Sequence, residues 1–237
     1  MPCSTIVGKS AIALLLSGLN ATQPIRQIVD IGPGMGSHRR LFGRLLPDAR
    51  WLAVEIWGPY IARYGLDRLY DHVYLSDVSC FDFSLIEPGG VILFGDVLEH
   101  MPKDTAKQIV SRAIGQFDLA VLSVPIGHWP QDEENDNPWE KHVDDWDVDD
   151  IDRSFAECLG GTVAVMFKPG IGLAVAVLAK PALRAAVRAQ VDRCRALLNA
   201  NRALVDCNLG FLPDLADDTV IAAFLGCIGP HLEGSAR

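Results

Sequence analysis

The sequence predicts an α/β fold built on a seven-stranded, mostly parallel sheet that helices cover on both faces. Short apolar runs alternate with segments of helical spacing from residue 25 to residue 159. Alternation of this kind gives a parallel sheet between two layers of helices. Two further apolar runs are joined through Pro169-Gly170, which is typical of an antiparallel hairpin. The sheet is therefore expected to end in an antiparallel terminal hairpin.

The predicted strands are short apolar runs without polar alternation. That pattern is typical of strands buried on both faces. It is clearest at residues 91–94, behind Gly89-Gly90, and at residues 119–124. The seven predicted strands span residues 25–31, 51–56, 73–75, 91–94, 119–124, 163–167 and 173–178.

The segments between the strands carry apolar residues at intervals of three and four, as helices with one buried face do. Proline stands at the start of two of them, where the first helical turn accepts it. The apolar run at residues 11–16 is short and lacks a good cleavage site, so it predicts a first amphipathic helix and not a signal peptide. The other helices are expected at residues 37–46, 59–69, 103–114 and 148–159.

The composition changes after Pro181. Residues 182–204 are rich in Ala, Leu and Arg with an apolar stripe, and a second apolar segment lies at residues 220–225. We therefore predict one domain over residues 1–180 and a helical C-terminal extension over residues 181–237. The extension is expected to pack on the core or to form a homo-oligomer by contact with another subunit.

The charge is concentrated in one segment. The chain has a net charge of −9, and residues 131–150 contain ten of its 30 acids but only one of its 21 lysines and arginines. The remainder is balanced, which argues against a basic face for duplex nucleic acid. This acidic segment belongs to a predicted lid over residues 125–150.

The cysteines and the longest apolar stretch both favour a cytoplasmic protein that does not span a membrane. The six cysteines are scattered without a C-x-x-C pair, which predicts reduced thiols. The apolar stretch at residues 162–179 is interrupted by Lys168-Pro169-Gly170, so it predicts two strands and not a membrane span. Gly8-Lys9-Ser10 matches the end of a phosphate loop, but no strand precedes it and no such loop is predicted.

A glycine-rich turn follows the first strand of the predicted sheet. It has the pattern D-x-G-x-G-x-G from Asp30 to Gly36, whereas dinucleotide folds use G-x-G-x-x-G. An acid at the end of the strand repels a pyrophosphate and suits an ammonium group or a ribose. The turn therefore favours a cationic amino-acid nucleoside over NAD.

Residues 29–36 resemble the first motif of the class I S-adenosylmethionine (SAM) methyltransferases, and the resemblance extends over residues 25–180. It implies a Rossmann-like fold with SAM as the cofactor. It also implies that Glu55, 25 residues after Asp30, accepts the ribose hydroxyls, and that Asp77-Val78 contacts the adenine. The cofactor-binding residues are then Asp30, Gly32, Pro33, Gly34, Gly36, Glu55, Asp77, Val78 and Asp96.

The run D-V-L-E-H-M-P after the fourth strand places Asp96, Glu99 and His100 on one face of a helical turn. Two carboxylates and an imidazole can form half of a divalent-cation site. The run resembles one in small-RNA 2′-O-methyltransferases and ubiquinone-pathway O-methyltransferases, which hold a metal there. That resemblance adds His142 to a site for Mg²⁺ or Mn²⁺. In metal-free relatives the Asp contacts SAM and the His is structural, and the short arm of Asp96 slightly favours this alternative.

His142 is the candidate catalytic base, with Asp96 beside it. It lies in the acidic segment, and residues 137–142 resemble bacterial methyltransferases of glycans and secondary metabolites. An imidazole titrates near neutrality and can take a proton from a hydroxyl group. Tryptophans and carboxylates in this segment suit a sugar, another polyhydroxylated acceptor or a cationic one. His128 is expected to serve packing or lid hydrogen bonding.

These observations predict a SAM-dependent O-methyltransferase that acts on a hydroxyl of a small molecule or glycan. A nicotinamide oxidoreductase is the alternative enzyme, and the glycine spacing disfavours it. A non-catalytic SAM-binding partner of another enzyme is the alternative outside the enzymes.

Overall fold

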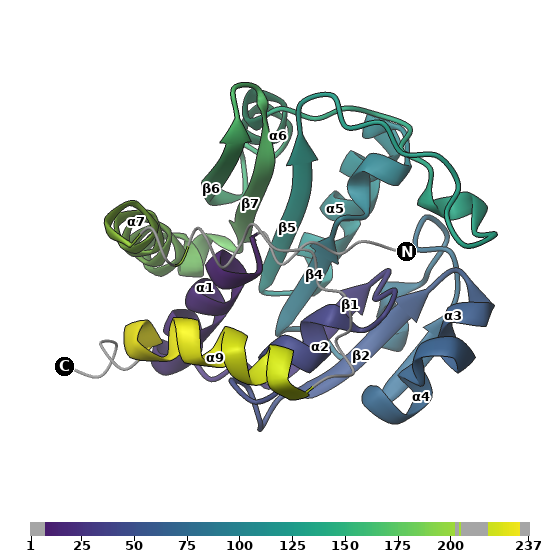
Figure 1. Cartoon of the computed structure of the whole chain (residues 1–237), viewed down its shortest axis with the longest axis horizontal. Helices are drawn as coiled ribbons and strands as arrows, with labels where there is room; N and C mark the ends of the chain where they lie inside the picture. Colours follow the sequence, from purple (N-terminus) through teal and green to yellow (C-terminus); the bar gives the residue numbers. More distant parts are fainter. Residues whose placement is uncertain (1–7, 202–203, 205–217, 233–237) are drawn as a thin grey trace.

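A computed structural model describes residues 8–201, 204 and 218–232. Its centre is a seven-stranded sheet in the spatial order β3-β2-β1-β4-β5-β7-β6 (Figure 1). The first five strands of that order are parallel, and β7 is antiparallel to both β5 and β6. The predicted fold class and its antiparallel terminal hairpin are confirmed. The strands are β1 (Gln27–Ile31), β2 (Arg50–Glu55), β3 (His72–Leu75), β4 (Val91–Gly95), β5 (Leu119–Ile126), β6 (Leu159–Lys168) and β7 (Ile171–Ala179).

Helices form a layer on each face of the sheet, and each layer buries its own apolar cluster. One layer contains α1 (Lys9–Thr22), α2 (Ser37–Phe42), α4 (Leu66–Leu69), α7 (Arg184–Ala200) and α9 (Asp218–Leu232). The other contains α5 (Lys103–Gln116) and α6 (Val148–Ser154). Figure 1 shows α1, α2 and α9 in front of the sheet and α5 behind it. The remaining helix is α3 (Gly58–Tyr64), and short 3₁₀ turns lie at Phe83–Leu85, Leu98–His100, Pro138–Glu140 and Pro181–Leu183.

The first helix is buried nearly all round, so the prediction of an amphipathic helix was wrong. Its side chains are buried from Lys9 to Leu16. An all-round apolar helix requires cover on every side, and here α7 and α9 supply it together with the sheet. The amide of Gln190 in α7 donates to the carbonyl of Leu14 at 2.9 Å. The described part of the C-terminal extension thus packs on the core, one of its two expected placements.

Two predicted helices end earlier than their patterns indicate, and a third is divided. The helix expected at residues 37–46 ends at Phe42. The helix expected at residues 59–69 is divided between α3 and α4 at Gly65, whose φ of 64° is left-handed. The helix expected at residues 148–159 ends at Ser154. Leu159 instead pairs with Leu178 as the first residue of β6. Its apolar side chain fits either element, and the sheet pairing decides between them.

Cys227 is disulfide-bonded, whereas Cys80, Cys158 and Cys194 are free thiols. The prediction of reduced cysteines is therefore wrong for Cys227.

In the described ranges, no helix combines the length and the apolar character needed to cross a membrane.

Candidate functional site

A cavity of about 410 Å³ lies at the carboxyl ends of the parallel strands. Open α/β sheets bind their ligands at this edge. Most of the predicted site residues line the cavity, although Asp30 and Gly36 do not. The predicted residues that line it are Gly32, Pro33, Gly34, Glu55, Asp77, Val78, Asp96, Glu99, His100 and His142.

The three glycines of the turn are required for different reasons. All three have a left-handed backbone, with φ between 53° and 76°. A Cβ on Gly32 would lie 2.8 Å from Val97, and one on Gly36 would collide with Leu69. A Cβ on Gly34 would meet no described atom within 4 Å. Gly32 and Gly36 are therefore needed for packing, whereas Gly34 leaves open space at the cavity.

Glu55 lies beside this open space at the end of β2 and is buried. Its Oε1 accepts a hydrogen bond from the Trp57 backbone N–H at 2.8 Å, and its Oε2 accepts one from the Gly34 N–H at 3.3 Å. Burial raises the pKa of Glu55 to about 7 despite these two bonds. The carboxylate is thus held in place at the cavity but is only partly ionised at neutral pH.

Asp30 lies beneath the turn and does not reach the cavity. Its Oδ2 accepts a hydrogen bond from the Tyr70 hydroxyl at 2.6 Å, and its Oδ1 lies 2.8 Å from Nδ1 of His38. The structure places Asp30 outside the cavity lining, so its role as a cofactor-binding residue stays a prediction. Its oxygens contact His38 in the first turn of α2 and Tyr70 just after α4, so Asp30 supports the loop from below.

A buried lysine, which the sequence did not single out, connects this support to the cavity. Lys9 is 0% exposed, and its Nζ lies 3.1 Å from Nε2 of His38 and 3.3 Å from Oδ2 of Asp96. An ammonium group can only donate, so Nε2 of His38 accepts and the ring proton is on Nδ1, facing Asp30. Oδ1 of Asp96 accepts from the Ser123 hydroxyl at 3.0 Å. Asp96 is held from two sides although its φ of 56° is unfavourable.

Replacing Lys9 with methionine should destabilise the protein by about 3 kcal/mol. This is the lower end of the range for removing one partner of a buried ion pair, because the Asp96 side chain is 23% exposed. Urea unfolding followed by circular dichroism measures the loss. Lys103→Met is the matched control, because its pair with Asp150 is partly exposed on both sides and should contribute below about 1 kcal/mol. Equal losses of stability in the two variants would show that the buried pair of Lys9 and Asp96 contributes no more than the partly exposed pair.

Glu99, His100 and His142 come together at the other end of the cavity. One potential ligand atom from each lies within 4.8 Å of those from the other two. Nδ1 of His100 lies 3.2 Å from the Lys141 carbonyl, and Nδ1 of His142 lies 2.6 Å from the Trp129 carbonyl. A carbonyl can only accept, so both Nδ1 atoms carry the proton and both Nε2 atoms offer a lone pair.

The electrostatics of this cluster suit neutral imidazoles around a buried carboxyl. Burial lowers the pKa of His100 and of His142 below the usual histidine value. Burial, with the nearby charge of Asp96, raises the pKa of Glu99 well above its usual range. Oε2 of Glu99 is buried and has no hydrogen-bond partner among the described residues. The cluster can therefore take up a proton or bind a cation.

The structure does not bring every predicted residue into this cluster. Asp96 lines the same cavity but pairs with Lys9 and Ser123, so it is not one of the three grouped ligands. His128 lies on the exposed lid, 2.8 Å from Asp145, and does not line the cavity.

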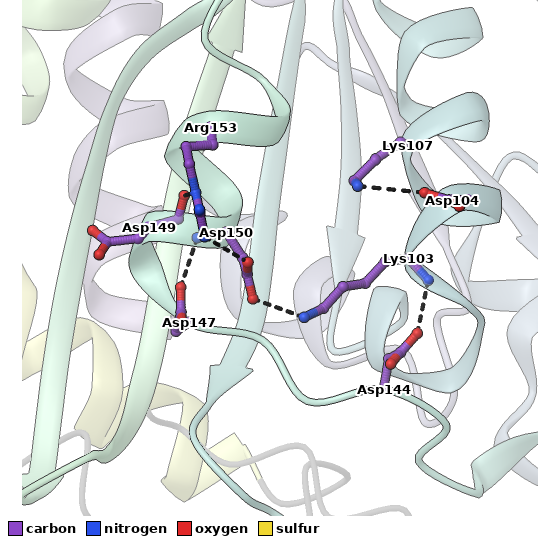
Figure 2. Close-up of polar contacts among 8 residues, drawn as sticks. All are labelled: Lys103, Asp104, Lys107, Asp144, Asp147, Asp149, Asp150 and Arg153. Atoms are coloured by element: carbon purple, nitrogen blue, oxygen red, sulfur yellow. Dashed lines mark hydrogen bonds and ion pairs between the residues drawn. The ribbon is translucent and has the colours of Figure 1, made fainter.

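Much of the acidic segment serves to anchor the lid. Figure 2 shows Asp144 and Asp150 meeting the two nitrogens of Lys103 at the start of α5. The distances are 2.9 Å to the backbone nitrogen and 2.7 Å to Nζ. Asp147 caps α6 by accepting from the Asp150 N–H at 2.6 Å. These carboxylates face other protein groups and not the cavity.

Glu140 differs from them because it lines the cavity. Its Oε1 accepts from the buried Tyr60 hydroxyl at 3.0 Å, which ties the lid to α3. Burial raises the pKa of Glu140 above its usual value. Trp129 and Trp139 also line the cavity, and Trp139 is 49% exposed. Glu140 and Tyr60 were not predicted as site residues, because only the fold places them together.

No protein-family model matches the chain, and the search of curated proteins gave no significant match. Solved structures do resemble it. The N-terminal domain of EvdMO1 with SAH bound has a TM-score of 0.55 and 14% identity, over 72% of this chain and 80% of that one. CalS10, a SAM-bound amino pentose methyltransferase from Micromonospora echinaspora, has a TM-score of 0.50 and 14% identity, over 72% and 90%.

The N-methyltransferase NodS from Bradyrhizobium japonicum WM9 has a TM-score of 0.50 and 13% identity, over 73% of this chain and 95% of that one. At such identities the similarity concerns the fold. The chain therefore shares its Rossmann-like fold with these three proteins.

Proposed function

We propose that the protein transfers the methyl group of SAM to a hydroxyl of a sugar, a glycan or a small secondary metabolite. One observation carries the proposal. A single cavity joins the open space over Gly34, with Glu55 beside it, to the Nε2 lone pair of His142. The proposed cofactor site and a proton acceptor thus share one cavity.

The cofactor end fits SAM better than NAD. Gly34 leaves open space for the cofactor, Glu55 would accept the ribose hydroxyls, and Asp77-Val78, which follows β3, would contact the adenine; all four residues line the cavity. None of the described residues lining the cavity is lysine or arginine, so a pyrophosphate would meet carboxylates without a cation. The antiparallel β7 also departs from the parallel order of dinucleotide-binding folds.

The acceptor end favours a neutral or cationic polyhydroxylated molecule. The same lack of lysine and arginine in the described lining disfavours phosphorylated and carboxylated acceptors. Trp129 and Trp139 offer aromatic faces on which a sugar ring can pack. CalS10, which has a similar fold, acts on an amino pentose. NodS is an N-methyltransferase, so our choice of oxygen rests on the imidazole at the transfer end.

The reaction we propose is an in-line displacement at the SAM methyl group. The sulfonium is already activated, so the protein mainly supplies proximity and orientation. Nε2 of His142 takes the proton of the acceptor hydroxyl, and the bond from Nδ1 to the Trp129 carbonyl holds the ring in that tautomer.

The donor set at Glu99, His100 and His142 also fits a divalent cation. Metal-bound histidines usually donate their other N–H to a carbonyl or carboxylate, and both histidines do so here. Oε2 of Glu99 is without a partner among the described residues. A Mg²⁺ or Mn²⁺ ion held by these three residues would lower the pKa of the acceptor hydroxyl. Asp96 would then act from outside the ligand set.

Calorimetry with SAM and with NAD tests the cofactor, and methyl transfer from radiolabelled SAM to a panel of sugars and small polyols tests the enzyme. SAM binding without transfer to any acceptor would favour the non-catalytic alternative. Homo-oligomerisation through the C-terminal extension and a cytoplasmic location stay predictions.

The affinity for SAM should rise with pH up to about 7. In the free protein Glu55 holds a proton below its pKa of about 7, and it must release that proton to accept both ribose hydroxyls beside a cationic ligand. Linkage of one proton gives up to about a tenfold change in Kd per pH unit below 7. Calorimetry between pH 5.5 and 7 measures this slope, and Glu55→Gln should flatten it. An affinity that is constant over this range in the wild type would contradict the role of Glu55.

A further inference from the structure

The lid contributes one carboxylate to the cavity. All ten acids of residues 131–150 lie in the described part of the chain, and only Glu140 among them lines the cavity. Its Oε1 accepts from Tyr60 at 3.0 Å and from Nδ2 of Asn137 at 3.4 Å. Tyr60 and Asn137 are both buried, one in the body and one in the lid. This carboxylate is therefore fixed in position before any ligand binds.

The surroundings of Glu140 connect the two ends of the cavity. Its Oε1 accepts from Tyr60, which follows Glu55 and β2 along the chain, and Glu140 precedes His142 in the lid; all four residues line the cavity. The sulfonium of SAM lies between its ribose and the group that receives its methyl. A carboxylate tied to both ends is therefore near the place that the sulfonium would occupy.

The charge of the cavity lining suits a positively charged ligand. Its acidic lining residues are Glu55, Asp77, Asp96, Glu99 and Glu140, and the described lining includes neither lysine nor arginine. Oε2 of Glu99 is buried, lacks a partner among the described residues and belongs to the same lining. SAM has a positive sulfur, whereas its product S-adenosylhomocysteine (SAH) has a neutral thioether and is otherwise alike. The interaction of a partly buried carboxylate with this charge is little screened by solvent.

We propose that Glu140 recognises the positive charge of the sulfonium, so that the lid binds SAM more tightly than SAH. The inference rests on the function proposed above. When the acceptor oxygen bonds to the methyl carbon, the electron pair of the C–S bond stays on sulfur and the hydroxyl proton passes to the base. The sulfur becomes neutral, its attraction to Glu140 is lost, and the product is released more readily than the cofactor.

Calorimetry with SAM, SAH and sinefungin tests the proposal without a known acceptor. Sinefungin has an amine, protonated at neutral pH, near the position of the sulfonium. The wild type should bind SAM and sinefungin about tenfold more tightly than SAH. Glu140→Gln keeps an oxygen that can accept from Tyr60 but removes the negative charge. It should weaken the binding of SAM and of sinefungin about tenfold, which corresponds to 1.4 kcal/mol. The affinity for SAH should stay within about twofold of the wild type. Glu133→Gln removes the same charge from an exposed lid position and should change none of the three affinities.

Each other outcome overturns the proposal. Equal weakening of SAM and SAH in Glu140→Gln would mean that Glu140 only closes the lid. Unchanged affinities would mean that it does not act on the cofactor, and an equal effect of Glu133→Gln would make the charge of the lid as a whole responsible. Retained SAH binding in Glu140→Gln shows that this variant is folded. If the wild type binds neither SAM nor SAH, the proposed function itself fails, which is a distinct result.

Discussion

Gly34→Val should abolish SAM binding and leave the fold intact. The position is left-handed, with φ of 53°, and its Cβ direction opens onto space that contains no described atom within 4 Å. A valine side chain there clashes with the cofactor and not with the protein. Two methyl groups forced into a fitted ligand site, with the loss of close backbone approach, should weaken SAM by at least about 100-fold, or roughly 2.7 kcal/mol. Calorimetry measures the affinity and thermal unfolding monitors the fold.

Gly65→Val is the matched control for this prediction. Gly65 has a similar φ of 64° and also has no described atom within 4 Å of its Cβ position, but it does not line the cavity. Both variants should therefore incur the same backbone strain of about 1–2 kcal/mol. The control should nevertheless bind SAM normally. If Gly34→Val binds SAM as well as Gly65→Val does, the cofactor is not where we place it.

His142→Ala should reduce turnover by about 10²–10⁴-fold while SAM binding is retained, if its imidazole is the general base. In that case EDTA should leave wild-type activity unchanged, and the variant should lose the rise of activity near neutral pH. If Glu99, His100 and His142 instead hold a metal, EDTA should suppress activity and Mg²⁺ or Mn²⁺ should restore it. Glu99→Gln should then raise the metal requirement sharply, because hard cations depend on the charge of their ligands.

His128→Ala is the control, because this second lid imidazole is exposed, pairs with Asp145 and does not line the cavity. Its activity should stay within about twofold of the wild type. If His142→Ala is fully active and EDTA does not change wild-type activity, the cluster contains neither the general base nor a required metal. Its role would then be structural.

The sequence predicts the sheet well because each buried strand needs a continuous apolar run, and helices between them need one apolar face. Boundaries are harder. Leu159 suits a helix or a strand equally, and only its pairing with Leu178 places it in β6. Gly65 interrupts a helical pattern through a backbone angle that the neighbouring side chains do not specify.

The candidate site could be predicted where its residues follow strands, since the ends of parallel strands meet at one edge of the sheet. Gly34, Glu55 and Asp77, which the glycine-rich turn and the resemblance to SAM methyltransferases indicated, line the cavity at that edge. Lys9 was not, because its partner Asp96 lies 87 residues further on and no spacing rule connects them. Glu140 pairs with Tyr60 at a separation of 80 residues for the same reason. Asp30 was expected at the ligand because it precedes the glycine-rich turn. A side chain at this point of a strand can face either the loop or the helix beneath it, and the sequence does not specify which.

The packing of α9 on α1 has a consequence for the order of events on the ribosome. Lys9 belongs to α1, yet α9, which lies against that helix and against α2, is synthesised after every strand of the sheet. Until residue 232 has left the exit tunnel, one side of α1 is exposed apolar surface, and the ammonium that steadies Asp96 is anchored on an incomplete layer. Synthesis from the N-terminus therefore completes the support of the ligand pocket only after all seven strands have been made, and nascent chains that stop before α9 are left with a bare hydrophobic face.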